Sequence, residues 1–75
     1  MRDGRYCIGG FIVTQKQRDV WKGLAESETT KGIALELGIG EKAVEYHRAK
    51  LYKALGIFDV AGITRAAIRT GLITP

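Results

Sequence analysis

The spacing of apolar positions divides the chain into four helical segments separated by short turns. At the start of the first segment, Thr14 and Gln17 stand three residues apart, as in a capping box that fixes a helix N-terminus. Val20 and Leu24 follow at an interval of four residues, which puts both side chains on one helix face. The pattern predicts a first helix that ends near Ala25.

A second, shorter helix is predicted after a polar stretch. Either Thr29 or Thr30 can cap its first turn with a hydroxyl oxygen. Gly38 ends it, because glycine readily adopts the left-handed conformation that follows a helix. Only two residues separate this stop from the next helical segment, so residues 30–54 form a candidate helix-turn-helix.

Two further helices complete the pattern. The third is predicted over residues 41–54 and ends before Gly56. Asp59 can then cap a fourth helix over about residues 60–70, which Gly71 ends.

The thirteen residues before these helices carry three glycines and no helical period. Within them, Tyr6–Ile8 and Phe11–Val13 are compatible either with short strands or with an arm that packs on the domain. The predicted fold is therefore an all-α, four-helix helix-turn-helix domain over residues 14–75. A short N-terminal arm, or short strands, over residues 1–13 precedes it.

The third helix has two unlike faces when it is laid on a helical wheel. An apolar stripe predicts a buried face and consists of Val44, His47, Leu51 and Leu55. The opposite stripe carries lysines, an aromatic ring and a small residue, a face that the DNA major groove can admit. Its members are Lys42, Tyr46, Ala49 and Lys53, flanked by Glu45 and Lys50.

The distribution of charge indicates an anionic partner more clearly than the total does. The chain has 75 residues and a formal net charge of +4. Residues 26–41 contain four glutamates and one lysine, whereas residues 42–53 contain four cations and one glutamate. This concentration of positive charge on one helix favours nucleic acid as the partner, ahead of a lipid surface.

Composition argues against several other classes of function. A chain of this length is expected to fold as one domain, and no apolar run is long enough to span a membrane. Its one cysteine, Cys7, and its one histidine, His47, supply neither a disulfide nor the ligand spacing of a zinc site, and no motif joins them as a catalytic pair. We expect no enzymatic activity, no cofactor, no metal and no membrane partner, and a location in the reducing cytoplasm.

From Val13 to Ile73 the chain resembles the LuxR-type, or GerE-like, helix-turn-helix domain. The residues that carry the resemblance are Thr30-Lys31-Gly32-Ile33-Ala34, Val44, His47, Leu51, Ala54-Leu55-Gly56-Ile57 and Gly71-Leu72-Ile73. Residues 44–49 are similar to the branch attached to two-component response regulators. The chain departs from the family pattern at Ser27, where a helix-ending glycine is usual, and at Val60, where arginine is frequent.

The resemblance implies sequence-specific binding of double-stranded DNA in transcription regulation, with residues 41–54 in the major groove. In the family, the positions of Glu45, Tyr46 and Ala49 face the bases. The start of the second helix can hold a phosphate through hydroxyls, free amides and one charge. The candidate DNA-binding residues are Thr29, Thr30, Lys31, Lys42, Glu45, Tyr46, Arg48, Ala49, Lys50 and Lys53.

The fourth helix is the candidate dimer contact. On its wheel, the residues predicted to face the core are Val60, Ile63, Ala67 and Ile68, and those predicted to face outward are Gly62, Arg65, Ala66 and Arg69. Two small outward residues would let a second helix approach closely, and domains of the family commonly pair through their last helix. We expect a weak homodimer that pairs on DNA.

A rival interpretation is a protein–protein adaptor that keeps the helix-turn-helix shape but binds DNA weakly, because of Glu45 and the acidic second helix. It would bind an RNA polymerase subunit or another regulator. Separately, Trp21 and Leu35 together form a candidate exposed contact for another protein. Since the twelve residues before Val13 cannot hold a sensor domain, the sequence is expected to be a stand-alone small regulator or the output domain of a longer one.

Overall fold

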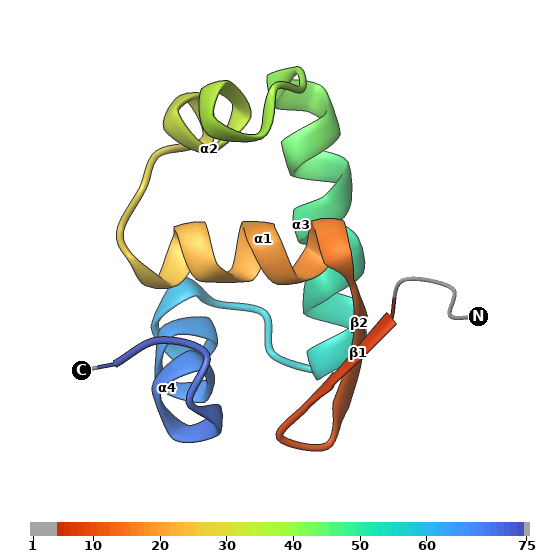
Figure 1. Cartoon of the computed structure of the whole chain (residues 1–75), viewed down its shortest axis with the longest axis vertical. Helices are drawn as coiled ribbons and strands as arrows, with labels where there is room; N and C mark the ends of the chain where they lie inside the picture. The colour runs from red at the N-terminus through yellow and green to blue at the C-terminus, as the bar shows by residue number, and fades with distance from the viewer. Residues whose placement is uncertain (1–4, 75) are drawn as a thin grey trace.

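The computed structural model describes residues 5–74 (Figure 1). Two short strands precede four helices, and the elements are β1 (Arg5–Ile8), β2 (Phe11–Thr14), α1 (Gln15–Ala25), α2 (Thr30–Leu37), α3 (Glu41–Leu55) and α4 (Val60–Thr70). The four-helix prediction is confirmed. The predicted N-terminal arm falls partly on residues 1–4, which lie outside the described residues.

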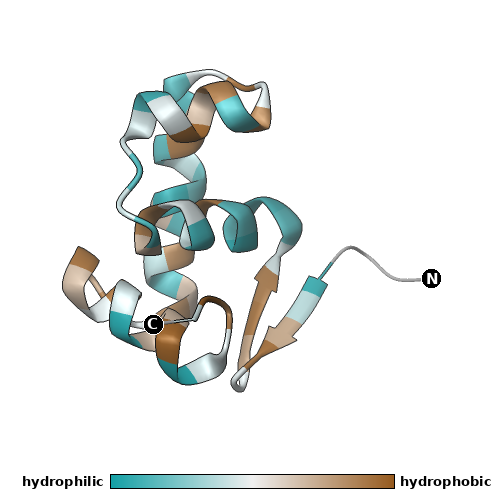
Figure 2. Ribbon diagram, turned by 60° about the vertical axis from the view of Figure 1, so that its left-hand side comes forward, coloured by the Kyte–Doolittle hydropathy of each residue, from teal (hydrophilic) through white to brown (hydrophobic). Residues whose placement is uncertain are grey.

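The segment before α1 forms an antiparallel hairpin, which decides between the two alternatives in favour of strands. Tyr6 lies opposite Val13 in the register. The turn consists of Gly9 and Gly10, whose φ angles of 58° and 89° are the positive values that a two-residue hairpin turn demands. β2 is hydrophobic over most of its length, whereas α1 presents hydrophilic residues on its outer side (Figure 2).

Side-chain caps fix the starts of three helices. The Thr14 hydroxyl accepts a hydrogen bond from the Gln17 amide at 3.1 Å, and the Gln17 side chain accepts one from the Thr14 amide at 2.9 Å. Thr29, rather than Thr30, caps α2, and Asp59 caps α4, each through a bond to the amide three residues later. The predicted capping box and the predicted cap of α4 are therefore confirmed.

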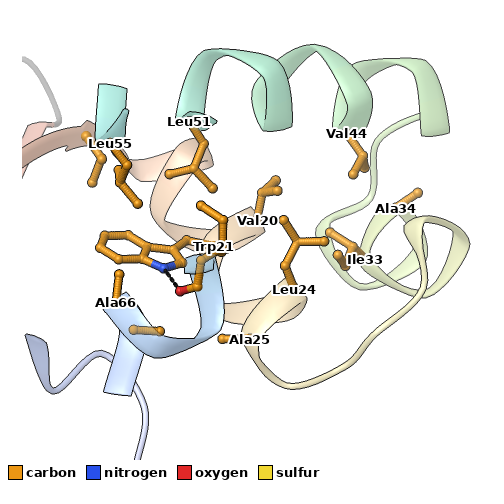
Figure 3. Packing of buried hydrophobic residues seen from close by; sticks show 13 residues of the cluster. Val20, Trp21, Leu24, Ala25, Ile33, Ala34, Val44, Leu51, Leu55 and Ala66 are labelled. Carbon is orange, nitrogen blue, oxygen red and sulfur yellow. Dashed lines mark hydrogen bonds between the residues drawn. The ribbon is translucent and has the colours of Figure 1, made fainter. Parts of the chain in front are cut away.

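The core lies between α1 and the other three helices (Figure 3). α1 crosses α3 and packs on α4, while α2 packs mainly on α3. The buried hydrophobic cluster comprises Val13, Val20, Trp21, Leu24, Ala25, Ile33, Ala34, Val44, Leu51, Leu55, Ile63, Ala66 and Ala67.

Trp21 lies at the centre of this cluster and has no exposed surface. Its indole Nε1 donates a hydrogen bond to the Ile63 carbonyl oxygen at 3.0 Å, and Phe11 meets the ring edge-on at a centroid distance of 6.0 Å. The prediction that Trp21 and Leu35 together form an exposed contact for another protein is therefore wrong for Trp21, whereas Leu35 is exposed as predicted. α4 and the hairpin cover the indole, and neither neighbour is visible in the local pattern of α1.

Gly23 sets the distance between α1 and α2. A Cβ at this position would lie 2.7 Å from the Ile33 Cγ1 atom, which is closer than non-bonded carbon atoms normally approach each other. The missing side chain lets Ile33 fill the space directly against the α1 backbone.

The orientation predicted for α4 is corrected by the structure. Gly62 and Ala66, predicted to face outward, are buried, whereas Val60 and Ile68, predicted to face the core, are 49% and 39% exposed. A Cβ at Gly62 would overlap the Ile57 side chain. Small residues face inward because α4 lies close to its neighbours, a constraint that a hydrophobicity wheel does not contain.

Candidate nucleic-acid interface

α3 places a charged and aromatic surface opposite a buried one. Val44, Leu51 and Leu55 anchor the helix in the core, with exposures of 1%, 0% and 7%. The side chains that point to solvent on the other side, which we call the α3 face, are Lys42, Glu45, Tyr46, Ala49, Lys50 and Lys53. Two faces of this kind follow from the 3.6-residue period of the helix.

Tyr46 and Lys50 form the middle of the α3 face. Tyr46 is 59% exposed, and the Lys50 ammonium lies 5.5 Å from the centroid of its ring, a cation–π contact. His47 meets the same ring edge-on at 5.4 Å and is half-buried. The imidazole thus packs at the border between the core and the α3 face and supports the Tyr46 ring.

The cations of α3 are not neutralised by neighbours. Among residues 5–74, no carboxylate lies within ion-pair distance of Lys42, Lys50, Lys53 or the half-buried Arg48. Glu45, one turn from Ala49, is the acidic member of the α3 face. Three lysines at one surface with a single carboxylate leave that surface positively charged.

The start of α2, with its cap Thr29, is the second part of the candidate interface. The Thr29 hydroxyl oxygen is engaged as the helix cap at 3.0 Å from the Gly32 amide. Thr30 is half-buried and Lys31 is exposed, and the amides of a first helical turn have no partner within the helix. These groups can contact a phosphate chiefly through amides and the Lys31 ammonium.

The turn between α2 and α3 holds the two helices in fixed relation. Gly38 ends α2 with φ of 69°. The Ile39 amide donates to the Ala34 carbonyl oxygen at 3.0 Å, and the Ile39 side chain packs against the core. The predicted helix-stop-helix is therefore an ordered turn that joins the end of α2 to the start of α3.

A contrasting acidic surface lies at the α1–α2 connection. Repulsion from the Glu36 carboxylate, together with partial burial and a hydrogen bond between the two side chains, raises the pKa of Glu28 above its ordinary value. Glu26 adds a further negative charge nearby. This surface repels phosphate and is separate from the α3 face.

The described helices include none that is long and apolar enough to cross a membrane. Within residues 5–74, no three histidine, cysteine or carboxylate side chains gather in a group that could hold a metal ion.

Comparison with known families identifies the domain. The profile of the bacterial regulatory proteins of the luxR family matches residues 12–67, which run from β2 into α4. The chain belongs to this family. The resemblance found in the sequence is thus confirmed, while β1 lies outside the matched range.

Two transcriptional regulatory proteins match the chain with similar sequence identity. The chain is 36% identical over 66 residues to the transcriptional regulatory protein MctR of Rhizobium johnstonii, covering 88% of the chain and 31% of MctR. It is 38% identical to the transcriptional regulatory protein UhpA of Escherichia coli, covering 71% of the chain and 27% of UhpA. The chain thus spans about a third or less of these two regulators.

Two further comparisons concern GerE. The spore germination protein GerE of Bacillus subtilis is 39% identical over 46 residues, covering 61% of the chain and 62% of that protein. A solved structure of the transcription factor GerE superposes with a TM-score of 0.71 and 26% identity, over 83% of the chain and 92% of that structure. The luxR-family fold assigned to this chain therefore rests on sequence and on structure together.

Phe58 is an exposed aromatic residue that the sequence pattern did not predict as a contact. Phe58, in the turn before α4, is 69% exposed and meets the Tyr52 ring edge-on at 6.3 Å. The local signal was an aromatic residue between Gly56 and the helix cap Asp59, a turn where polar residues are usual.

Proposed function

We propose that this chain binds double-stranded DNA sequence-specifically and regulates transcription, with α3 lying in the major groove. The observation that carries the proposal is the α3 face, since its three exposed lysines and one aromatic ring stand directly opposite a fully buried stripe. A major groove is wide enough to admit an α-helix. Membership of the luxR family supports the same role, which belongs in the cytoplasm, where a bacterial chromosome lies.

Within this proposal the contacts divide into two kinds. Glu45 can accept a hydrogen bond from cytosine N4, and Ala49 can pack on a thymine methyl group, while Tyr46 lies between them and Lys50. Lys42, Lys50, Lys53 and Arg48 reach phosphates, as do Thr29, Thr30 and Lys31 at the start of α2. Phosphate contacts fix the position on DNA and base contacts select the sequence.

We also propose a weak homodimer that forms on DNA through α4. Because Gly62 and Ala66 are buried, the contact shifts to the exposed side of the helix, where Val60 and Ile68 supply apolar surface. Arg65 and Arg69 are exposed next to it and repel their symmetry mates, which keeps the dimer weak. A two-fold pair would place two α3 helices in successive major grooves about 10 base pairs apart.

A second candidate function is an adaptor that contacts RNA polymerase or another regulator. It is favoured by Leu35, which is 75% exposed on α2, close to the acidic surface of Glu28 and Glu36. An adaptor of this kind needs no DNA affinity of its own.

Titration of a labelled random-sequence duplex with the chain, at low and at physiological salt, separates the two functions. DNA binding through α3 gives clear binding at low salt that weakens as salt rises. Absence of binding at both salt concentrations would reject the DNA-binding proposal and leave the adaptor.

A further inference from the structure

Two surfaces of this chain outside the α3 face carry opposite charges, and each exposes a large apolar side chain. The first is a projection on α2. Leu35 is the most exposed of the large hydrophobic residues described, at 75%. Gly32, one turn earlier, has no side chain to cover it. The Glu28 carboxyl group lies beside Gly32 and close to the Glu36 carboxyl group. We call Leu35 with Glu28 and Glu36 the α2 knob.

The second surface is a hollow of about 450 Å³ beside the start of α4. Its apolar lining comes from Ile57 and Phe58, and its charged lining from Arg65, Arg69 and Asp59. The Asp59 carboxylate is already engaged with the Gly62 amide at 2.8 Å as the helix cap. The α4 hollow is therefore lined by two large apolar side chains and by two guanidinium groups.

The α2 knob and the α4 hollow cannot meet within one chain. The longest extent of the molecule is 32 Å, and α2 and α4 lie at its opposite ends (Figure 1). An apolar projection that fits a hollow elsewhere on the same molecule produces a head-to-tail contact between copies. We propose that the α2 knob of one copy docks in the α4 hollow of the next, with Leu35 against Phe58 and the two glutamates facing Arg65 and Arg69.

This contact differs from the proposed two-fold dimer. The dimer uses Val60 and Ile68, whereas the hollow uses Ile57 and Phe58 in the turn before α4, and Arg65 and Arg69 lie beside both. A two-fold contact joins like surfaces and stops at two copies, while a head-to-tail contact joins unlike surfaces and continues.

The dimensions of the molecule suit such a row on DNA, a step that rests on the proposed function. Copies bound to direct repeats one helical turn apart are separated by about 34–36 Å, which is close to the 32 Å longest extent. Copies at this separation are near enough for the α2 end of one to face the α4 end of the next. The contact is small, so it is weak in free solution and gains strength when DNA holds two copies together.

The first experiment omits DNA, so that its failure is distinct from failure of the proposed function. Sedimentation equilibrium at high protein concentration and low salt compares the wild-type chain with Leu35→Asp and with Arg65→Glu. Both positions are exposed, so both variants stay folded. Lys16→Glu, exposed on α1, provides the same change of charge as Arg65→Glu at a distant site.

The expected result is a wild-type average mass that rises with concentration, a similar rise for Lys16→Glu, and none for Leu35→Asp or Arg65→Glu alone. An equal mixture of the two defective variants should form dimers and go no further, because each keeps the surface that the other has lost. A wild-type chain that stays monomeric, or a Leu35→Asp variant that associates as the wild type does, overturns the proposal.

A second experiment uses a duplex with two copies of a site that the chain itself selects from a random library. On direct repeats 10 base pairs apart, the first bound copy should raise the affinity for the second by about 5–150-fold, the range of typical couplings between sites. Leu35→Asp should remove that gain and leave single-site affinity unchanged. An equal gain on repeats 15 base pairs apart, where the copies lie on opposite sides of the duplex, would contradict the proposed geometry.

Discussion

The Trp21 indole donates a hydrogen bond of 3.0 Å to the carbonyl oxygen of Ile63, a residue 42 positions further along the chain. Both residues are fully buried. The bond ties α1 to α4, and thereby joins the helix that supports α3 to the helix proposed as the dimer contact.

Replacement of Trp21 by Phe removes this bond and part of the buried ring. We expect Trp21→Phe to lower the free energy of unfolding by about 1–3 kcal/mol, from one lost hydrogen bond and the space left by the smaller ring. Urea unfolding followed by circular dichroism measures the change. A loss below about 0.5 kcal/mol would mean that the indole nitrogen contributes little to the packing of α4.

The turn after α1 contains a residue in an unfavourable conformation. Ser27 has φ of 66°, in the left-handed region that favours glycine. We expect Ser27→Gly to raise the free energy of unfolding by about 1 kcal/mol, because glycine removes the Cβ clash of that conformation. Ser27→Ala retains the Cβ atom and serves as the control, with an expected change within about 0.5 kcal/mol.

Substitution of Glu45 tests which side of α3 contacts the bases. Its carboxylate repels phosphates but can accept a hydrogen bond from cytosine, so Glu45→Gln should bind random DNA more tightly. The same variant should lose about 1–3 kcal/mol of discrimination at one base position of a selected site. Competition between selected and random duplexes measures both effects. A variant with the parent's affinity for every sequence would show that Glu45 does not face the groove.

The corrected orientation of α4 changes the test of the dimer. Ile68→Glu, at an exposed position, should leave the monomer folded and weaken binding to an inverted repeat about 5–150-fold more than binding to a half-site. Ala66→Glu, at a position 2% exposed, should instead destabilise the fold by about 3–5 kcal/mol, because it buries an unpaired charge. If Ile68→Glu weakens both sites equally, the dimer does not use this side of α4.

Local signals in the sequence predicted the helices and their ends well. Thr14 and Asp59 cap the helices that their positions predicted, and Gly38 ends α2. These features depend on neighbours within four residues, so a single segment contains the information. The exposed side of α3 followed in the same way from its period.

Features that depend on distant contacts were not predicted. The burial of Trp21 requires α4 and the hairpin to lie over it, and the inward turn of Gly62 and Ala66 requires the close approach of Ile57. Ser27 departs from the family's usual glycine, a difference visible in the sequence, but its positive φ is visible only in the structure. The hollow beside Phe58 forms from the turn after α3 and from α4 together, so neither segment reveals it alone.

If the α3 face contacts DNA phosphates, the affinity of the chain for a duplex depends on the salt concentration. The logarithm of the association constant for a duplex, plotted against the logarithm of salt concentration, should fall with a slope of about −0.9 for each phosphate contacted. Lys50→Gln and Lys53→Gln should each make that slope shallower by about 0.9, whereas Lys22→Gln, exposed on α1, should not change it. An affinity that does not vary with salt, or a slope that Lys50→Gln and Lys53→Gln leave unchanged, would show that the α3 face does not contact DNA phosphates.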